Sequence, residues 1–384
     1  MKNIFLFLFL FFGIYSQAQP ATYFRIPQPR ANLYGFANLS TPDSGYIGID
    51  KGPLALKLSG YTTQRTITLL KFDSHSSLVK QIPLAGGEKV FSSYYTDIKK
   101  AGGKYWFLYM EAPEGHKIGN IMAREVDPIT LEMDQPRILV PATDMEITPK
   151  YIYVEPQVQL KTSPDGKQSA MLISLNLGQV VVIGFDHSMK PLWTKRDTIG
   201  SYYESLRSVT IDNEARVYVS YLKEKTCFIR RYTQNGLYQN MPVNLDGPAP
   251  SELILQVLKN DQVVLCGTYT RNDYTSVGVY QTFFIDDGRL EKFRMIDFPD
   301  SLVRILARDS WGSTKSKKYG LTPSCHIRII EMPDGTVSMV VEFKADPHYS
   351  NQSGDLLVIS LNKGKGIFAR IPKYSVDYGG DQGD

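Results

Sequence analysis

The histidines are the side chains of this chain that would most readily bind a metal ion or transfer a proton near neutral pH. They stand far apart and show no metal-ligand spacing: His75, His116, His187, His326 and His348. His75 and His187 each follow a Phe-Asp pair in a polar stretch. We therefore expect both to be solvated turn residues, and the sequence predicts no metal site and no bound cofactor.

Aspartates recur at one place in the sequence pattern, directly after apolar runs that are typical of strands: Asp73, Asp127, Asp186 and Asp286. Carboxylates at equivalent positions could form a ring of acids. A strand-ending Asp is also a favoured turn residue, because its side chain accepts hydrogen bonds from nearby backbone N–H groups. We favour the turn role and expect these turns to lie on one face of the fold.

Three glutamates stand just before strand-like runs: Glu155, Glu204 and Glu252. Acids from separate parts of a fold can meet as the acid pair of a polysaccharide hydrolase or lyase. The favoured interpretation of each is a hydrated loop residue. The chain also has no Gly-x-Ser-x-Gly elbow, Walker loop or Gly-x-Gly-x-x-Gly motif, so the catalytic residues of any enzyme activity are unknown.

The cysteines, Cys227, Cys266 and Cys325, are odd in number and form no pair at metal-ligand spacing. Cys227 and Cys266 lie inside apolar runs. Buried free thiols are therefore the favoured prediction, with one disulfide as the alternative.

The longest interruption of the pattern lies between Phe298 and Cys325. Cations stand beside aromatic side chains in it, and the candidate binding residues are Arg308, Trp311, Lys315, Lys317, Lys318 and Tyr319. Long insertions in a rigid scaffold often bind partners, and this composition fits an acidic glycan or a protein. The favoured alternative is a helix over 301–308 and a solvated loop that cap the scaffold. A second irregular stretch, 344–355, is expected on the same side.

Two kinds of hairpin alternate along the chain and must position these residues. The first kind, a strand, a turn with Gly, Asp or Asn and a second strand, occurs at 97–111, 157–174, 206–221, 253–269 and 326–343. The second kind follows each of these at 120–140, 180–199, 227–245, 282–298 and 356–373, and a sixth copy lies at 66–84. Two hairpins per unit make four strands per unit.

Four-stranded antiparallel units that repeat at about 40 to 60 residues are typical of a β-propeller, because each unit must cover its two apolar faces with neighbours. We predict a single all-β propeller of six blades. Seven blades are the alternative number, and a two-domain β-sandwich array is the alternative fold. Residues 33–61 supply either a degenerate first hairpin or a strand that closes the ring.

The turn phrases SPDGK and MPDGT each begin a strand rich in aliphatic residues. They resemble the blade turns of secreted bacterial β-propellers of the WD40-like (PD40) and NHL types, which have six to eight blades. The Trp-Asp dipeptide, the sialidase Asp-box and a recurring kelch double glycine with its spaced Tyr and Trp are missing, so no residue role is carried over. The resemblance implies a scaffold that is used for binding more often than for one chemistry.

The N-terminus has the pattern of a secretory signal peptide: Lys2, an apolar run from Ile4 to Ile14, and small residues before a cleavage point after Ala18. We therefore expect a secreted or periplasmic protein with no membrane span after cleavage. The predicted organisation is a signal peptide at 1–18, an N-terminal segment at 19–32, the propeller at 33–374 and a flexible tail at 375–384.

The formal net charge of the chain is +4, and loss of Lys2 leaves it close to neutral, so a nucleic-acid partner is not expected. The function predicted from these observations is a secreted binding module for a protein or carbohydrate partner, and catalysis is not expected. A propeller-type polysaccharide hydrolase or lyase, with acids from several blades, is the alternative.

Overall fold

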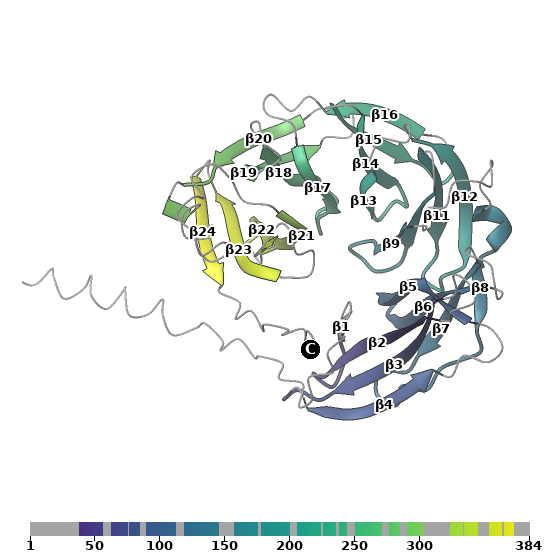
Figure 1. The fold of residues 1–384 in the computed structure, drawn as a ribbon. Helices are drawn as coiled ribbons and strands as arrows, with labels where there is room; N and C mark the ends of the chain where they lie inside the picture. The colour runs from purple at the N-terminus through teal and green to yellow at the C-terminus, as the bar shows by residue number, and fades with distance from the viewer. Residues whose placement is uncertain are drawn as a thin grey trace, which may run out of the picture.

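The computed structural model of the protein describes residues 38–371 apart from the segments 57–62, 76, 85–89, 113–118, 146–156, 176–177, 200–205, 224–225, 236–237, 244–249, 271–275, 285–289, 300, 303–322, 333, 345–352 and 363–364. The described residues form 24 strands in six four-stranded antiparallel blades, which are arranged as a β-propeller (Figure 1). A single residue pair, Gln64 with Ser92, also connects the sheets of blades 1 and 2.

Each blade is a contiguous piece of the chain whose first strand lies nearest the centre (Figure 1). Blade 1 comprises β1 (Asn38–Ser40), β2 (Tyr46–Leu56), β3 (Thr63–Phe72) and β4 (Leu78–Leu84), and blade 2 comprises β5 (Val90–Ala101), β6 (Lys104–Ala112), β7 (Asn120–Val126) and β8 (Arg137–Val140). Blade 3 comprises β9 (Gln157–Thr162), β10 (Ser169–Ser174), β11 (Gln179–Phe185) and β12 (Pro191–Thr198), and blade 4 comprises β13 (Leu206–Ile211), β14 (Val217–Lys223), β15 (Thr226–Tyr232) and β16 (Tyr238–Val243). Blade 5 comprises β17 (Pro250–Val257), β18 (Val263–Thr270), β19 (Ser276–Phe284) and β20 (Leu290–Asp297), and blade 6 comprises β21 (Pro323–Glu331), β22 (Val337–Lys344), β23 (Ser353–Asn362) and β24 (Lys365–Ile371).

The position of a strand within its blade follows from its pattern of side chains. In β11 every residue from Val180 to Phe185 is buried, because neighbouring blades cover both faces of this strand. In β12, the outermost strand of the same blade, exposed and half-buried residues alternate. An outermost strand meets solvent along one edge, so it tolerates polar side chains that an inner strand excludes.

Five apolar cores lie between successive blades. The core between blades 2 and 3, for example, joins Trp106 and Met110 of β6 to Met171 and Phe185 of blade 3. Equivalent cores join blades 1 and 2, 3 and 4, 4 and 5, and 5 and 6. The ring is therefore held largely by burial of apolar surface between neighbouring blades.

The repeated Pro-Asp-Gly phrase forms the tight turn between the first two strands of a blade. In blade 3, Gly166 has a φ of 75° and donates its N–H to the carbonyl of Ser163 at 2.9 Å. Gly335 has a φ of 76° in the equivalent turn of blade 6. Glycine is favoured at this left-handed position because it has no Cβ to clash with the backbone.

The structure confirms the predicted six-bladed propeller and all eleven predicted hairpins, and the seven-bladed and β-sandwich alternatives are wrong. Residues 38–56 supply the degenerate first hairpin, in which β1 pairs with β2. Within the described residues β24 pairs with β23 and no strand is exchanged between blades 1 and 6. Blade 1 is therefore built entirely from the N-terminal part of the described chain, and blade 6 entirely from its C-terminal part.

Several smaller predictions concern residues that are only partly described. Cys227 and Cys266 are buried free thiols as predicted, whereas Cys325 lies on β21 and its side chain is outside the described residues. Of the helix predicted over 301–308, Ser301 and Leu302 are helical and the remainder is outside the described residues. Among the helices that the structure describes, none has the length and apolar character of a membrane span.

Candidate functional site

The turns between the first two strands of successive blades form a chain of hydrogen bonds around one mouth of the propeller. Neighbouring blades from blade 2 to blade 6 are each linked in this way. The links are Gly102 N–H to the Gly166 carbonyl (2.8 Å), Asp165 N–H to Asn213 Oδ1 (3.0 Å), Asn213 N–H to Asp261 Oδ1 (3.4 Å) and Lys259 N–H to Glu331 Oε2 (3.0 Å). These turns therefore fix the inner ends of the blades relative to one another.

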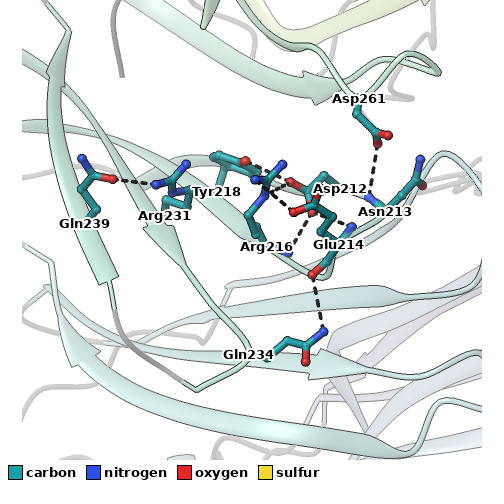
Figure 2. Close-up of polar contacts among 9 residues, drawn as sticks. All are labelled: Asp212, Asn213, Glu214, Arg216, Tyr218, Arg231, Gln234, Gln239 and Asp261. Carbon is teal, nitrogen blue, oxygen red and sulfur yellow. Dashed lines mark hydrogen bonds and ion pairs between the residues drawn. The ribbon is translucent and has the colours of Figure 1, made fainter. Parts of the chain in front are cut away.

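The turn of blade 4 is built on a carboxylate that is completely buried (Figure 2). Oδ1 of Asp212 accepts hydrogen bonds from the backbone N–H groups of Glu214 (3.0 Å) and Arg216 (2.9 Å). Oδ2 accepts from Arg216 Nε (2.6 Å) and the Tyr218 hydroxyl (2.9 Å). Burial, together with the negative charge of Asp212, raises the pKa of Tyr218. A carboxylate with four donors serves the structure of the turn and has no free lone pair for a substrate.

The turn role predicted for the strand-ending aspartates is confirmed for three of them. Asp73 accepts backbone hydrogen bonds from His75 and Ser77, and Asp127 accepts them from Ile129 and Thr130. Asp186 likewise accepts from the backbone of Ser188 and Lys190. Since the turns between strands 1 and 2 and between strands 3 and 4 of an antiparallel sheet lie at the same end, they share one face of the propeller as expected. Asp286 is outside the described residues.

On the innermost strands, apolar and polar side chains alternate along the chain. On β9, Leu160 packs into the core with blade 2, and Gln159 and Lys161 belong to the other alternation. On β21, Ile327 and Ile329 pack into the core with blade 5, and Arg328 stands between them. Successive strand residues point to opposite faces, so these polar groups face away from the cores that Leu160, Ile327 and Ile329 enter. They lie on the innermost strands (Figure 1), which enclose the central space of the ring, here called the central channel.

Two cations from opposite blades influence each other across this central channel. Blades 3 and 6 face each other in the ring, with β9 and β21 on their inner sides (Figure 1). Burial lowers the pKa of Lys161, and so do the positive charges of Lys99 and Arg328, while Asp97 opposes the shift. Lys161 and Arg328 are nevertheless accessible to solvent. Lys161 is therefore reached by solvent although neighbouring elements partly shield it from water.

The remaining charges on β5 partly neutralise each other. Lys99 Nζ lies 2.8 Å from Asp97 Oδ2, and both side chains are half-buried. Among the residues that the structure describes, none forms an ion pair with the side chain of Lys161 or Arg328, and Asp97 only partly offsets the positive charge around Lys161. The described part of the channel thus has two positive charges without an ion-pair partner.

A groove of about 490 Å³ opens at the rim of blade 2, beside the turn of blade 1. Its walls include Tyr105 and the carboxylates of Glu125, Asp127 and Asp134. Glu125 is paired with Lys104 at 2.6 Å, and Asp134 accepts the backbone N–H of Glu125. Backbone hydrogen bonds from Thr130 and Ile129 lower the pKa of Asp127. These acids are occupied in local structure and are not free to act as an acid pair.

The candidate residues of the insertion lie outside the described residues: Arg308, Trp311, Lys315, Lys317, Lys318 and Tyr319. The insertion leaves the outermost strand of blade 5 and enters the innermost strand of blade 6, so it is attached to the face opposite the turns. The ends of β22 and β23 that flank 344–355 lie on that same face.

The other candidates have mixed outcomes. His75 and His187 are exposed turn residues, as predicted. His116 and His348 are outside the described residues, as are Glu155, Glu204 and the side chain of His326. Glu252 was expected before a strand and instead lies within β17, where it pairs with Thr268 because the strand begins earlier, at Pro250; its side chain is not described. No group of potential metal ligands occurs in the described part of the chain.

Sequence reasoning missed Lys161 and Arg328. A signal was present, because QVQLKT and HIRIIE place polar residues at alternate positions of first strands. The alternation predicts that these residues face away from the blade core. It does not identify which strands lie across the ring from each other.

No protein-family model matches this chain, and no curated protein matches it. Solved structures share its architecture. A candidate 6-phosphogluconolactonase from Bacteroides uniformis has 12% sequence identity and a TM-score of 0.51, with 88% of this chain and 84% of that chain covered. A polysaccharide lyase, an ulvan lyase, has 10% identity and a TM-score of 0.51, with 87% and 80% covered. At these identities the likeness shows the β-propeller fold alone.

Proposed function

We propose that the protein is an exported β-propeller that binds a protein or carbohydrate partner at the turn-side mouth of its central channel, without altering it chemically. The observation that supports this function is the polar alternation of the innermost strands. Gln159, Lys161 and Arg328 contribute to no apolar core, and both cations remain accessible. Polar side chains that converge on an accessible concave space are typical of a binding site.

Export is proposed from the first 18 residues, whose charge, apolar run and small residues fit a cleavable signal peptide. A secreted or periplasmic location fits a partner that is itself outside the cytoplasm. Detection of a mature chain that begins at Gln19, in the periplasm or the culture medium, would test this part of the proposal.

A propeller-type polysaccharide hydrolase or lyase is the second candidate, because the ulvan lyase with the same fold was solved bound to the saccharide GlcA(1-4)Rha3S. The carboxylates in the described turns are occupied by backbone donors, which disfavours them as the acid pair. The two candidates differ in the fate of the ligand, which is recovered intact from a binding protein and cleaved by an enzyme.

The test uses the mature chain, residues 19–384, on an array of neutral, carboxylated and sulfated oligosaccharides and against extracts of the cell envelope. A Gln159→Trp variant fills the channel beside β9, and Thr194→Trp on the exposed outer strand of the same blade is the matched control. We expect capture that Gln159→Trp abolishes and Thr194→Trp preserves, with the ligand intact by mass spectrometry. Failure of the wild-type chain to capture any partner refutes the proposal, and cleavage of the captured saccharide supports the second candidate.

A further inference from the structure

We propose that Lys161 and Arg328 form a two-cation site in the central channel for an acidic saccharide, whose carboxylate or sulfate groups bridge blades 3 and 6. This inference rests on the proposed function for the location of the ligand and adds its chemical class. Lys161 lies on β9 and Arg328 on β21, the innermost strands of two blades that face each other across the ring (Figure 1).

The alternation of each strand sets the direction of these side chains. Leu160 precedes Lys161 and is buried against blade 2, while Ile327 and Ile329 flank Arg328 and are buried against blade 5. Lys161 and Arg328 therefore point away from those two cores. Blades 3 and 6 share no interface, so the mutual influence of these cations acts through the space at the centre.

Charge balance argues for an anionic ligand. Lys99, the third cation near Lys161, is paired with Asp97 at 2.8 Å. No described residue forms an ion pair with Lys161 or Arg328, and Asp97 offsets only part of the positive charge around Lys161. Like charges that face each other in a partly desolvated channel repel more strongly than they would in bulk water. A ligand with two or more negative charges removes this repulsion and forms charge-assisted hydrogen bonds with both side chains.

The neighbouring polar groups favour a saccharide among the possible anions. Gln159 stands two residues before Lys161 on the same alternation of β9, and Gln256 is half-buried on β17, the innermost strand of blade 5. An amide side chain both donates and accepts hydrogen bonds, as sugar hydroxyl groups require. Arginine adds a planar fork that matches a carboxylate or sulfate group.

Such a ligand would also link the ring across its diameter. Blades 1 and 6 exchange no strand among the described residues. In the described part of the chain, no ladder of backbone hydrogen bonds therefore joins these two blades. A ligand that binds only the folded state stabilises it by RT ln(1 + L/Kd), where L is the free ligand concentration, so the stabilisation grows with that concentration. We therefore expect the melting temperature to rise with the concentration of the acidic saccharide.

The experiment is calorimetric titration of the mature chain with trigalacturonate, a sulfated galactotriose and neutral galactotriose. The variants are Lys161→Gln, Arg328→Gln and the matched control Lys195→Gln, which removes a cation from the outermost strand of blade 3. Both channel side chains are accessible, so their replacement should leave the fold intact, as thermal unfolding of each variant without ligand will verify.

We expect at least one acidic trisaccharide to bind more tightly than galactotriose and to weaken as salt is added. Each channel variant should weaken it by about tenfold or more, because a hydrogen bond to a charged group is lost. Lys195→Gln should bind like the wild type. Comparison of the carboxylated and sulfated ligands identifies which anion the site prefers.

Equal affinity of the wild type and the Lys161→Gln and Arg328→Gln variants for the acidic ligand overturns the inference, as does an equal loss in Lys195→Gln. Preference for an acidic protein segment over every saccharide also overturns it. If the protein instead captures a neutral saccharide or another protein, and Gln159→Trp abolishes that capture, the inference fails while the proposed function holds. If no ligand of any class binds, both fail.

Discussion

Replacement of Asp212 by Asn tests how far the turn of blade 4 depends on its buried carboxylate. The side chain of Asp212 is 0% exposed, and Oδ2 accepts hydrogen bonds from Arg216 and the Tyr218 hydroxyl. Asn preserves the shape of the side chain and can keep the backbone hydrogen bonds to Oδ1. Its Nδ2 group is a donor, however, so it would face the donor Nε of Arg216 without forming a bond.

The expected loss of unfolding free energy can be estimated from these contacts. Removal of one partner from a buried ion pair costs about 3–5 kcal/mol, and the low end applies because the side chain of Arg216 is 22% exposed and stays partly hydrated. The Tyr218 hydroxyl can rotate to accept a hydrogen bond from Nδ2, which recovers about 1 kcal/mol. We therefore expect Asp212→Asn to destabilise the protein by about 2–3 kcal/mol.

Urea unfolding followed by circular dichroism measures this loss as a lower midpoint. The matched control is Glu214→Gln, which removes a second carboxylate 3.1 Å from Arg216 in the same turn, but one whose side chain is 71% exposed. An exposed pair contributes about 0–1 kcal/mol, so the control should unfold close to the wild type. Equal midpoints for Asp212→Asn and Glu214→Gln would refute the argument that burial makes the Asp212 contacts stabilising.

Three further predictions follow from other parts of the structure. Gly166→Ala should destabilise the protein by about 1 kcal/mol and lower its melting temperature. Gly166 has a φ of 75°, which is unfavourable for a residue with a Cβ, and no atom lies close enough to the added Cβ to compensate by packing. Ala215→Gly, at a φ of 62°, should raise the melting temperature slightly. Hydrogen bonds from Lys71 and Thr41 lower the pKa of Asp43 from 3.8 to about 2, so stability present above pH 3.8 should fall as the pH approaches 2, and Asp43→Asn should unfold with less dependence on pH in that range. Burial and the positive charges of Lys99 and Arg328 lower the pKa of Lys161, and Asp97 partly offsets this effect. As the pH rises, Lys161 should therefore lose its charge, and the protein its affinity for an acidic ligand, at a lower pH than expected for an ordinary lysine. Binding measurements at increasing pH will check this.

The blades could be predicted from the sequence because their determinants are local. The turn of blade 3 has Asp165 and Gly166 between two strands, and the same pair recurs in blade 6 as Asp334 and Gly335. Each hairpin needs only a turn of this kind and two strands with the right alternation. The aspartates after the third strand were equally predictable, since their hydrogen bonds reach no further than four residues along the chain.

The contacts between blades could not be predicted from the sequence, because they join residues from different repeats. The hydrogen bond from Asn213 to Asp261 depends on the spacing of two turns in the folded ring. The groove at blade 2 likewise requires Pro42 of one blade beside Asp127 of the next. Such contacts are set by how the sheets stack, which the pattern of a single blade does not specify.

The interaction between Lys161 and Arg328 differs from the long-range contacts between neighbouring blades, because it does not stabilise the fold. The cores and the turn hydrogen bonds join neighbouring blades and lower the free energy of the closed ring. Two cations on opposite blades share no core, and their repulsion opposes closure, most strongly where water is partly excluded. Residues that oppose stability without a packing role are concentrated at functional sites. The same property that makes this pair unfavourable for the empty ring makes the channel suited to a ligand that supplies negative charge.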